Sequence, residues 1–164
     1  MRLGELLQGG ELLLLDGQLG MGKTTFTQGL ARGLEITDVV SSPTFTLLKE
    51  YAGRPRPVAP AAEGKETGAA PVVMGPALYH FDLYRLDDPE EILDLGFEDY
   101  FYGSGVCVVE WADKADMLWP DERLRIQMKM LSETKRGLLF IATGEHYCEL
   151  LRQLQKNTYG TTSS

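Results

Sequence analysis

The sequence predicts an α/β domain of three layers, in which helices cover both faces of a mixed β-sheet. Short apolar runs typical of buried strands alternate along the chain with segments of helical periodicity. The first such run, residues 11–16, is mostly leucine, as is typical of a parallel strand covered on both faces. The chain has 164 residues, of which 43% are hydrophobic. That length suits one hydrophobic core, so we expect a single domain over residues 1–156.

The first half of the chain is expected to place a strand, a glycine-rich loop and a helix in direct succession. The helix has an apolar stripe of Phe26, Leu30 and Leu34 at spacings of four. The expected elements are, in order, a helix end at residues 3–7, a strand at 11–16, a helix at 23–34, and extended segments at 45–51 and 78–84.

Between those two extended segments, residues 52–77 are rich in Pro, Gly and Ala. Such a composition disfavours packed elements, so we predict a flexible loop insertion that joins the two strands.

In the second half, the acidic and proline-containing segment 87–90 has the features of a helix start. That helix is expected to run to Leu95 and to stop at Gly96. The remaining expected elements are a strand at 106–109 that ends in Glu110, strands at 123–130 and 137–142, a helix at 145–155, and a disordered tail at 157–164.

Composition argues against two classes of function. The formal net charge of −8 argues against a protein that binds nucleic acid alone, because phosphate neutralisation needs clustered Lys and Arg. The longest apolar run, residues 12–15, is far shorter than the roughly 18 residues that suggest a membrane span. No secretory signal is visible at the N-terminus, so we expect a cytoplasmic protein without a membrane segment.

Residues 17–24 match the pattern GxxxxGK[ST] and lie between an apolar strand and an amphipathic helix, as a phosphate-binding loop requires. Glycines let backbone amides approach phosphate oxygens, and the helix adds the positive end of its dipole. Lys23 is expected to neutralise the β and γ phosphates, and the Thr24 hydroxyl to bind Mg²⁺. The sequence therefore predicts a P-loop NTPase-like domain with ATP and Mg²⁺ as cofactors. The residues expected at the nucleotide are Gly17, Leu19, Gly20, Met21, Gly22, Lys23, Thr24, Thr25 and Thr44.

A P-loop ATPase also needs an acid near the metal, usually at the end of a neighbouring strand. Glu110 ends an apolar strand, and we favour metal ligation, directly or through water, over an ordinary surface acid. Asp82 lies among apolar and aromatic residues, where a carboxylate is costly to bury unless it is paired. A salt bridge with Arg85 and a role in orienting water or metal both satisfy that argument. Lys23, Asp82 and Glu110 are the candidate catalytic residues.

Other polar residues receive simpler interpretations. Thr44 is either a turn hydroxyl or part of a segment that senses the γ-phosphate. His80 and His146 have no metal-spaced partners and are interpreted as structural or exposed. Trp111 is interpreted as a core or interface residue.

Four segments together strongly resemble the TsaE (YjeE) family of bacterial ATPases, in order and in spacing. They are GQLGMGKTTFTQGLARGL, SSPTFTLLKEY, LYHFDLYRLDDPEEILDLGFEDYF and VCVVEWADKADMLWPDERLRI. The resemblance covers nearly the whole chain outside residues 52–77 and the tail. The HFDLYRL and VEW segments are more specific than the P-loop alone.

The resemblance implies a part in making threonylcarbamoyladenosine in tRNA. Members of the family bind ATP and hydrolyse it slowly, in dependence on the partners TsaD and TsaB, which would also hold the tRNA. On matching positions, the family pattern implies Lys23 at the phosphates, Thr24 and Glu110 at Mg²⁺, and Asp82 as an essential acid near the γ-phosphate. It also implies a switch-like segment at residues 42–45, with Trp111 beside the site.

Two departures and one alternative accompany this resemblance. Gln18 stands where the family usually has Asp or Glu, so hydrolysis is expected to change more readily than binding. The loop at 52–77 is longer than the usual hairpin connection. A small kinase that phosphorylates a metabolite or nucleoside would also use a P-loop and nearby acids, although no acceptor site or basic lid is evident. The preference for ATP over GTP and the oligomeric state are not legible in the sequence.

Overall fold

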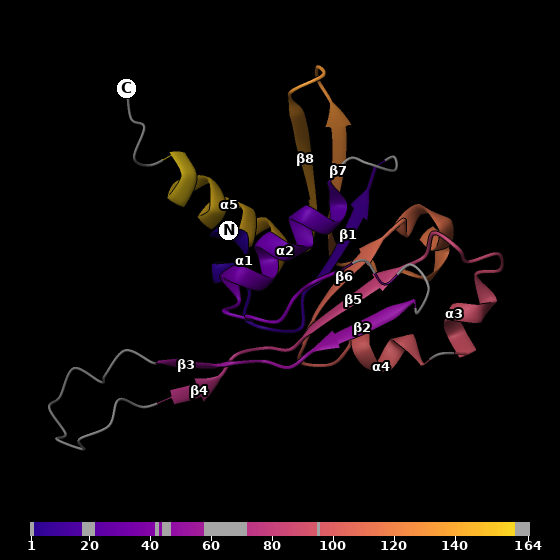
Figure 1. Ribbon diagram of the computed structural model, residues 1–164, viewed down its shortest axis with the longest axis horizontal. Coiled ribbons are helices and arrows are strands. Elements are labelled where there is room, and N and C mark those ends of the chain that lie inside the picture. The colour runs from indigo at the N-terminus through magenta and orange to yellow at the C-terminus, as the bar shows by residue number, and fades with distance from the viewer. Residues whose placement is uncertain are drawn as a thin grey trace, which may run out of the picture.

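The computed structural model describes residues 2–17, 22–41, 43, 47–57, 72–94 and 96–159. Its centre is a six-stranded sheet of order β2-β5-β6-β1-β7-β8 (Figure 1). The inner pairs are parallel, and the two edge strands β2 and β8 pair antiparallel with β5 and β7. The sheet is therefore mixed, as predicted. Its strands are β1 (Leu12–Asp16), β2 (Leu48–Tyr51), β5 (Leu78–Asp82), β6 (Val106–Glu110), β7 (Arg123–Met130) and β8 (Arg136–Thr143).

Helices cover both faces of this sheet and give the predicted three layers (Figure 1). On one side lie α1 (Arg2–Leu6), α2 (Lys23–Gly33) and α5 (Glu145–Tyr159). On the other lie α3 (Glu90–Asp94), α4 (Phe97–Phe101) and the 3₁₀ helix η1 (Ala112–Leu118).

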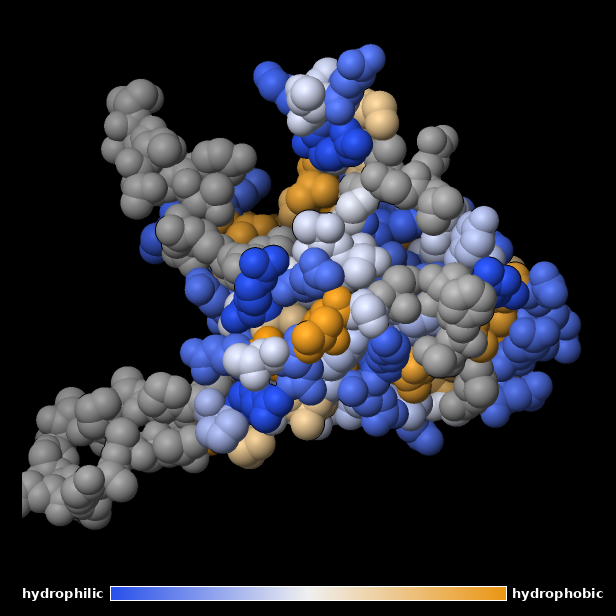
Figure 2. Space-filling view, viewed as in Figure 1, coloured by the Kyte–Doolittle hydropathy of each residue, from blue (hydrophilic) through white to orange (hydrophobic). Residues whose placement is uncertain are grey.

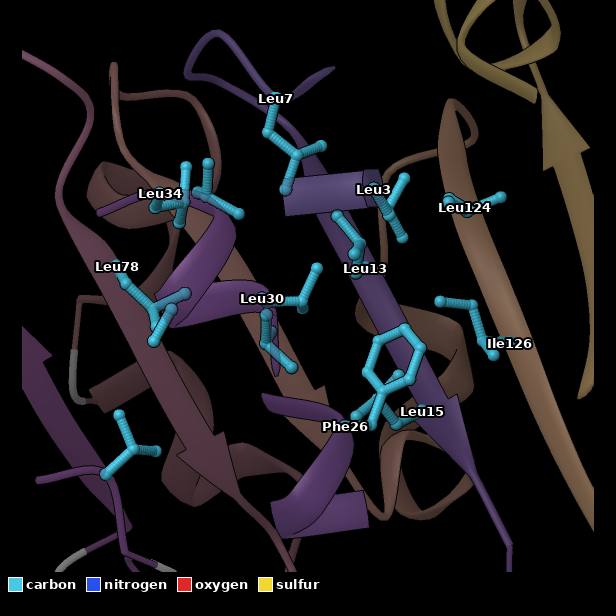
Figure 3. Close-up of a cluster of buried hydrophobic side chains, with 14 of the residues drawn as sticks. Leu3, Leu7, Leu13, Leu15, Phe26, Leu30, Leu34, Leu78, Leu124 and Ile126 are labelled. Carbon is cyan, nitrogen blue, oxygen red and sulfur yellow. The ribbon is translucent and has the colours of Figure 1, made fainter. Parts of the chain in front are cut away.

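The core consists of two apolar clusters, one on each face of the sheet. In the view of Figure 2 the described surface is mostly hydrophilic, with apolar side chains in separate small areas. The first cluster joins α1, α2 and α5 to alternate strand residues such as Leu13, Leu78 and Val108 (Figure 3). The second contains the intervening residues, such as Leu14 and Phe81. Because side chains alternate along a strand, Leu12 to Leu15 of β1 are buried alternately by the two clusters.

Most predicted elements are confirmed within a few residues, including the strand and helix on either side of the glycine loop. Two short helices were not predicted. Helix α4 follows Gly96, which adopts a left-handed conformation with φ 71° and separates it from α3. Helix η1 follows the end of β6, in a segment where no element was expected.

The prediction of a loop without regular structure at residues 52–77 is wrong at its two ends. Strands β3 (Pro55–Pro57) and β4 (Val72–Met74) form an antiparallel two-stranded ribbon, in which Pro57 faces Val72. The ribbon projects from the main sheet between β2 and β5 (Figure 1). Proline is tolerated here because strands of an isolated pair each have one edge outside the ladder. Residues 58–71, in the middle of the predicted loop, lie outside the described residues.

No helix in the described part of the chain is both long and apolar enough to cross a membrane.

Candidate functional site

Strands β1, β5 and β6 each end in an acidic residue at the carboxyl edge of the sheet. Asp82 and Glu110 are direct neighbours in the parallel pairing of β5 with β6, and Leu15 pairs with Glu110 from the other side. Asp16, the next residue, ends β1. Asp82 and Glu110 are each only 3% exposed. Carboxylates are rarely buried to this extent without a cation or hydrogen bonds, so this edge is organised around polar contacts.

The cation at this edge is Lys23, the first residue of α2, which is itself only 5% exposed. Its Nζ donates a hydrogen bond to the carbonyl oxygen of Gly17 at 2.6 Å and lies 3.4 Å from the centre of the Trp111 ring. Burial lowers the pKa of Lys23, and the nearby carboxylates Glu110, Asp82, Asp113 and Asp16 partly oppose that shift. The ammonium group is thus poorly hydrated, a state that favours binding of an anion.

The turn that leads into α2 is built to present backbone N–H groups. Gly22 caps the helix with φ 92°, a left-handed conformation that a residue with a side chain rarely adopts. The Phe26 N–H bonds to the Gly22 carbonyl and starts the helical ladder, and no side chain in the described part of the chain caps the N-terminus. The N–H groups of the first turn, which includes Thr24 and Thr25, are therefore available to an anion.

The structure thus brings Gly17, Gly22, Lys23, Thr24 and Thr25 to one turn beside the buried acids. The other residues predicted at the nucleotide, Leu19, Gly20, Met21 and Thr44, lie outside the described residues, as does the departure at Gln18.

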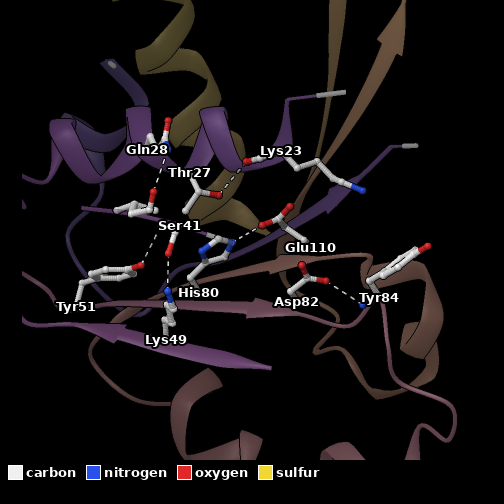
Figure 4. A network of polar contacts seen from close by, with 11 residues as sticks. Lys23, Thr27, Gln28, Ser41, Lys49, Tyr51, His80, Asp82, Tyr84 and Glu110 are labelled. Carbon is white, nitrogen blue, oxygen red and sulfur yellow. Dashed lines mark hydrogen bonds and ion pairs between the residues drawn. The ribbon is translucent and has the colours of Figure 1, made fainter. Parts of the chain in front are cut away.

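Glu110 is held by a residue that sequence reasoning did not assign to the site. Nε2 of His80 contacts Oε2 of Glu110, and the imidazole is fully buried (Figure 4). His80 lies two residues before Asp82 on β5, so both side chains point to the α2 face of the sheet. The two-residue spacing of His80 and Asp82 along a strand was the sequence feature that could have placed His80 at the site. The role of His80 was missed because its partner, Glu110, is 30 residues away, on the neighbouring strand.

Asp82 accepts a hydrogen bond from the backbone N–H of Tyr84 at 2.9 Å, which fixes the turn after β5. The Tyr84 ring packs against Trp111 at 5.0 Å between centroids. Trp111 therefore lies beside Lys23 and Tyr84 at the site, as the resemblance implied. Its backbone is in the left-handed region with φ 59°, which is uncommon for a bulky residue and turns the chain sharply after Glu110.

A second polar network, which the sequence did not suggest, joins the end of β1 to η1. Arg125 on β7 pairs with Asp16 and donates to Asp116 Oδ1 on η1 at 2.6 Å. Burial raises the pKa of Asp16, and the hydrogen bond from Arg125 only partly offsets the effect. The network fixes the strand end from which the glycine loop departs.

Oxygen donors at this site fit Mg²⁺. The described residues contain no group of three or more His, Cys, Asp or Glu side chains arranged to hold a metal by themselves. Mg²⁺ typically takes one or two protein oxygens and completes its shell with water and substrate phosphates. A threonine hydroxyl in the first turn of α2 and the buried carboxylate of Glu110 are donors of that kind.

Comparison with known proteins gives a consistent result. The family model of the threonylcarbamoyl adenosine biosynthesis protein TsaE matches residues 1–138. The chain is 43% identical to the tRNA threonylcarbamoyladenosine biosynthesis protein TsaE of Bacillus subtilis over 148 residues, which are 90% of this chain and 80% of that protein. It is 37% identical to the TsaE protein of Treponema pallidum, with 82% of this chain and 84% of that protein aligned. The crystal structure of Bacillus subtilis YdiB superposes with a TM-score of 0.71 at 35% identity, covering 96% of this chain and 85% of that one.

Proposed function

The chain belongs to the TsaE family of threonylcarbamoyl adenosine biosynthesis proteins, and from that premise we propose that it binds Mg-ATP at the carboxyl edge of its sheet and hydrolyses it slowly. The observation that carries this proposal is the position of Lys23. A buried ammonium group at a helix N-terminus, among the carboxylates of two neighbouring strands, suits a site for polyphosphate and a divalent cation.

Binding follows from the side chains at this turn. A phosphate oxygen is a stronger acceptor than the Gly17 carbonyl that Lys23 contacts, because the bond is then between opposite charges. The first-turn N–H groups of α2 would bind the same phosphates. Thr24 and Glu110 would hold Mg²⁺, which supplies positive charge to the phosphate oxygens as negative charge develops on them.

Hydrolysis would proceed by in-line attack of water on the γ-phosphorus. The new P–O bond forms as the bond to the β–γ bridging oxygen breaks, and ADP leaves with that electron pair while the proton of the water passes to the released phosphate. Asp82 or Glu110 would position the water. Arg125, which pairs with the end of β1, is held by Asp16 and Asp116. We therefore assign Arg125 no part in the transition state and expect slow turnover by the isolated protein.

The biological role we propose is that of an accessory ATPase for threonylcarbamoyladenosine formation in tRNA, acting in the cytoplasm with TsaD and TsaB. The net charge of −8 supports an arrangement in which the partners hold the tRNA.

Equilibrium binding of ATP with excess Mg²⁺ tests the nucleotide site directly. We expect Lys23→Ala to weaken binding by roughly 10- to 100-fold, the range for loss of a charge-assisted hydrogen bond. Lys156→Ala, which removes an exposed lysine of α5, is the matched control for net charge and should bind as the wild type does. Equal affinity in the Lys23 variant and the wild type would disprove the site.

A further inference from the structure

His80 is a buried titratable side chain that the proposed reaction does not use. Strands β5 and β6 are parallel neighbours in which Asp82 pairs with Glu110. His80 precedes Asp82 by two residues and faces the same side of the sheet, so its imidazole lies one step behind the two acids, toward the core. Figure 4 shows Glu110 between this imidazole and the side chain of Lys23.

The contact between His80 and Glu110 is enclosed by protein. The imidazole is 0% exposed and the glutamate side chain 4% exposed. Nε2 of His80 meets Oε2 of Glu110, whereas the buried Nδ1 has no hydrogen-bond partner among the described residues. An unpaired N–H is costlier than an unpaired acceptor nitrogen in such surroundings, so the contact is best described as Nε2–H donating to the carboxylate.

We propose that His80 is a positioning residue that fixes one oxygen of Glu110, so that the other is held toward the metal; this inference rests on the proposed Mg-ATP site. A glutamate has three rotatable side-chain bonds, and their freedom is lost when the carboxylate is ordered. Mg²⁺ demands near-ideal octahedral geometry from its few protein ligands. A carboxylate ordered when the protein folds incurs no further ordering cost when the metal binds.

The same contact accounts for a histidine between Leu78 and Asp82 on the α2 face of β5. Leu78, two residues before His80, belongs to the core cluster under α2. An apolar residue at position 80 would extend that cluster and would leave a buried carboxylate oxygen without its donor. A partner that orients a metal ligand is typically worth about 10- to 100-fold in metal affinity.

Two variants of nearly equal shape separate this role from simple packing. His80→Gln keeps an N–H donor at about the reach of Nε2, and His80→Met replaces it with a side chain of similar length that cannot donate. We expect the Met variant to require about 10- to 100-fold more Mg²⁺ for half-maximal tightening of ATP binding. The Gln variant should lie closer to the wild type than to the Met variant.

The measurement is ATP affinity across an Mg²⁺ titration, with a parallel series in EDTA and a melting curve for each protein. In EDTA all three proteins should bind ATP alike, because His80 acts only through the metal ligand. Equal Mg²⁺ dependence in the wild type and the Met variant would overturn the positioning role, and so would an equal loss in the Gln and Met variants. If the wild type itself bound no ATP, the proposed site rather than the role of His80 would have failed.

A second set of variants tests whether His80 acts through Glu110 or only through its effect on folding. In a Glu110→Gln protein the carboxylate that His80 positions is already lost, so adding His80→Met should change the Mg²⁺ dependence no further. A further loss of similar size in the double variant would mean that His80 acts independently of Glu110 and would refute the inference.

Discussion

At the scale of single residues, the site depends on buried charges that are costly to the fold. Lys23, Asp82 and Glu110 are each at most 5% exposed, although each carries a group that water would solvate strongly. Their mutual proximity offsets part of that cost, because each carboxylate favours the charged form of the lysine. Such groups are retained where binding or chemistry needs them.

Asp16 provides a prediction about pH at this scale. Because burial raises its pKa in the folded protein, the folded state takes up this proton at a higher pH than the unfolded state does. Ionised Asp16 therefore reduces stability at neutral pH, and the wild type recovers that stability as the pH falls through the raised pKa toward 3.8. We expect the melting temperature of Asp16→Asn, minus that of the wild type, to decrease steadily over that interval.

Thermal melts of both proteins at pH 7 and at mildly acidic pH measure this difference. Asp121→Asn, which removes a charge from an exposed position, controls for net charge. A difference that instead grows in favour of Asp16→Asn as the pH falls would show that Arg125 dominates over burial and lowers the pKa.

Sequence reasoning identified the residues whose chemistry is local and missed those defined by contacts across the sheet. Lys23 follows a glycine pattern whose spacing carries its own physical meaning. Glu110 was found because an acid ending an apolar strand is conspicuous. His80 and Arg125 act through partners on neighbouring strands, 30 and 109 residues away, and no local pattern reports such a pairing. Thr44 lies outside the described residues, so its place at the nucleotide stays a prediction.

At the scale of elements, the carboxyl edge combines a helix N-terminus, three strand ends and a sharp turn. Strand β6 ends in Glu110, and the left-handed residue Trp111 immediately redirects the chain into η1. Lys23 contacts the ring of this same residue. Elements with strong periodicity, such as β7 at residues 123–130, could be predicted to the residue. Helix η1 could not, since a short 3₁₀ helix depends on tertiary contacts more than on local preference.

The ribbon of β3 and β4 gives a prediction at this scale. Because Pro57 faces Val72, replacing residues 58–71 with Asn-Gly would close the ribbon with a two-residue turn. The ribbon belongs to a separate sheet from the six strands that carry the site. We expect ATP affinity to be unchanged and the melting temperature to shift by no more than about 2 °C, because loop length alters closure entropy only slightly.

Binding and melting of this shortened protein can be compared directly with the wild type. A matched variant that keeps the length but replaces residues 58–71 with Gly and Ser separates length from sequence. A large loss of ATP affinity in both would contradict the separation of ribbon and site and would assign residues 58–71 a part in nucleotide binding.

At the scale of the whole molecule, the arrangement follows from strand order. Strand β1 lies in the middle of the sheet between β6 and β7, and the loop that leaves its carboxyl end leads directly to α2. In open α/β sheets, ligands bind outside the carboxyl ends of such strands. The fold class and mixed sheet were predictable because alternating strands and helices leave few topologies. The antiparallel pairing of β8 with β7 and the projecting ribbon of β3 and β4 could not be predicted in the same way, because they depend on pairing between strands.

The net charge and the site geometry together favour a role in which the protein depends on partner proteins. The formal net charge of −8 argues against a protein that holds tRNA by itself, because phosphate neutralisation needs clustered Lys and Arg. We therefore expect the rate of nucleotide hydrolysis to change when the partners that hold the tRNA are present.

The most direct test is the rate of phosphate release from Mg-ATP by this protein alone and together with its TsaD and TsaB partners. Lys23→Ala and Glu110→Ala serve as site variants in both conditions. We predict slow release by the isolated protein, a faster rate with the partners, and loss of both activities in the two variants. A rate that the partners leave unchanged, or one that survives both substitutions, would contradict this prediction.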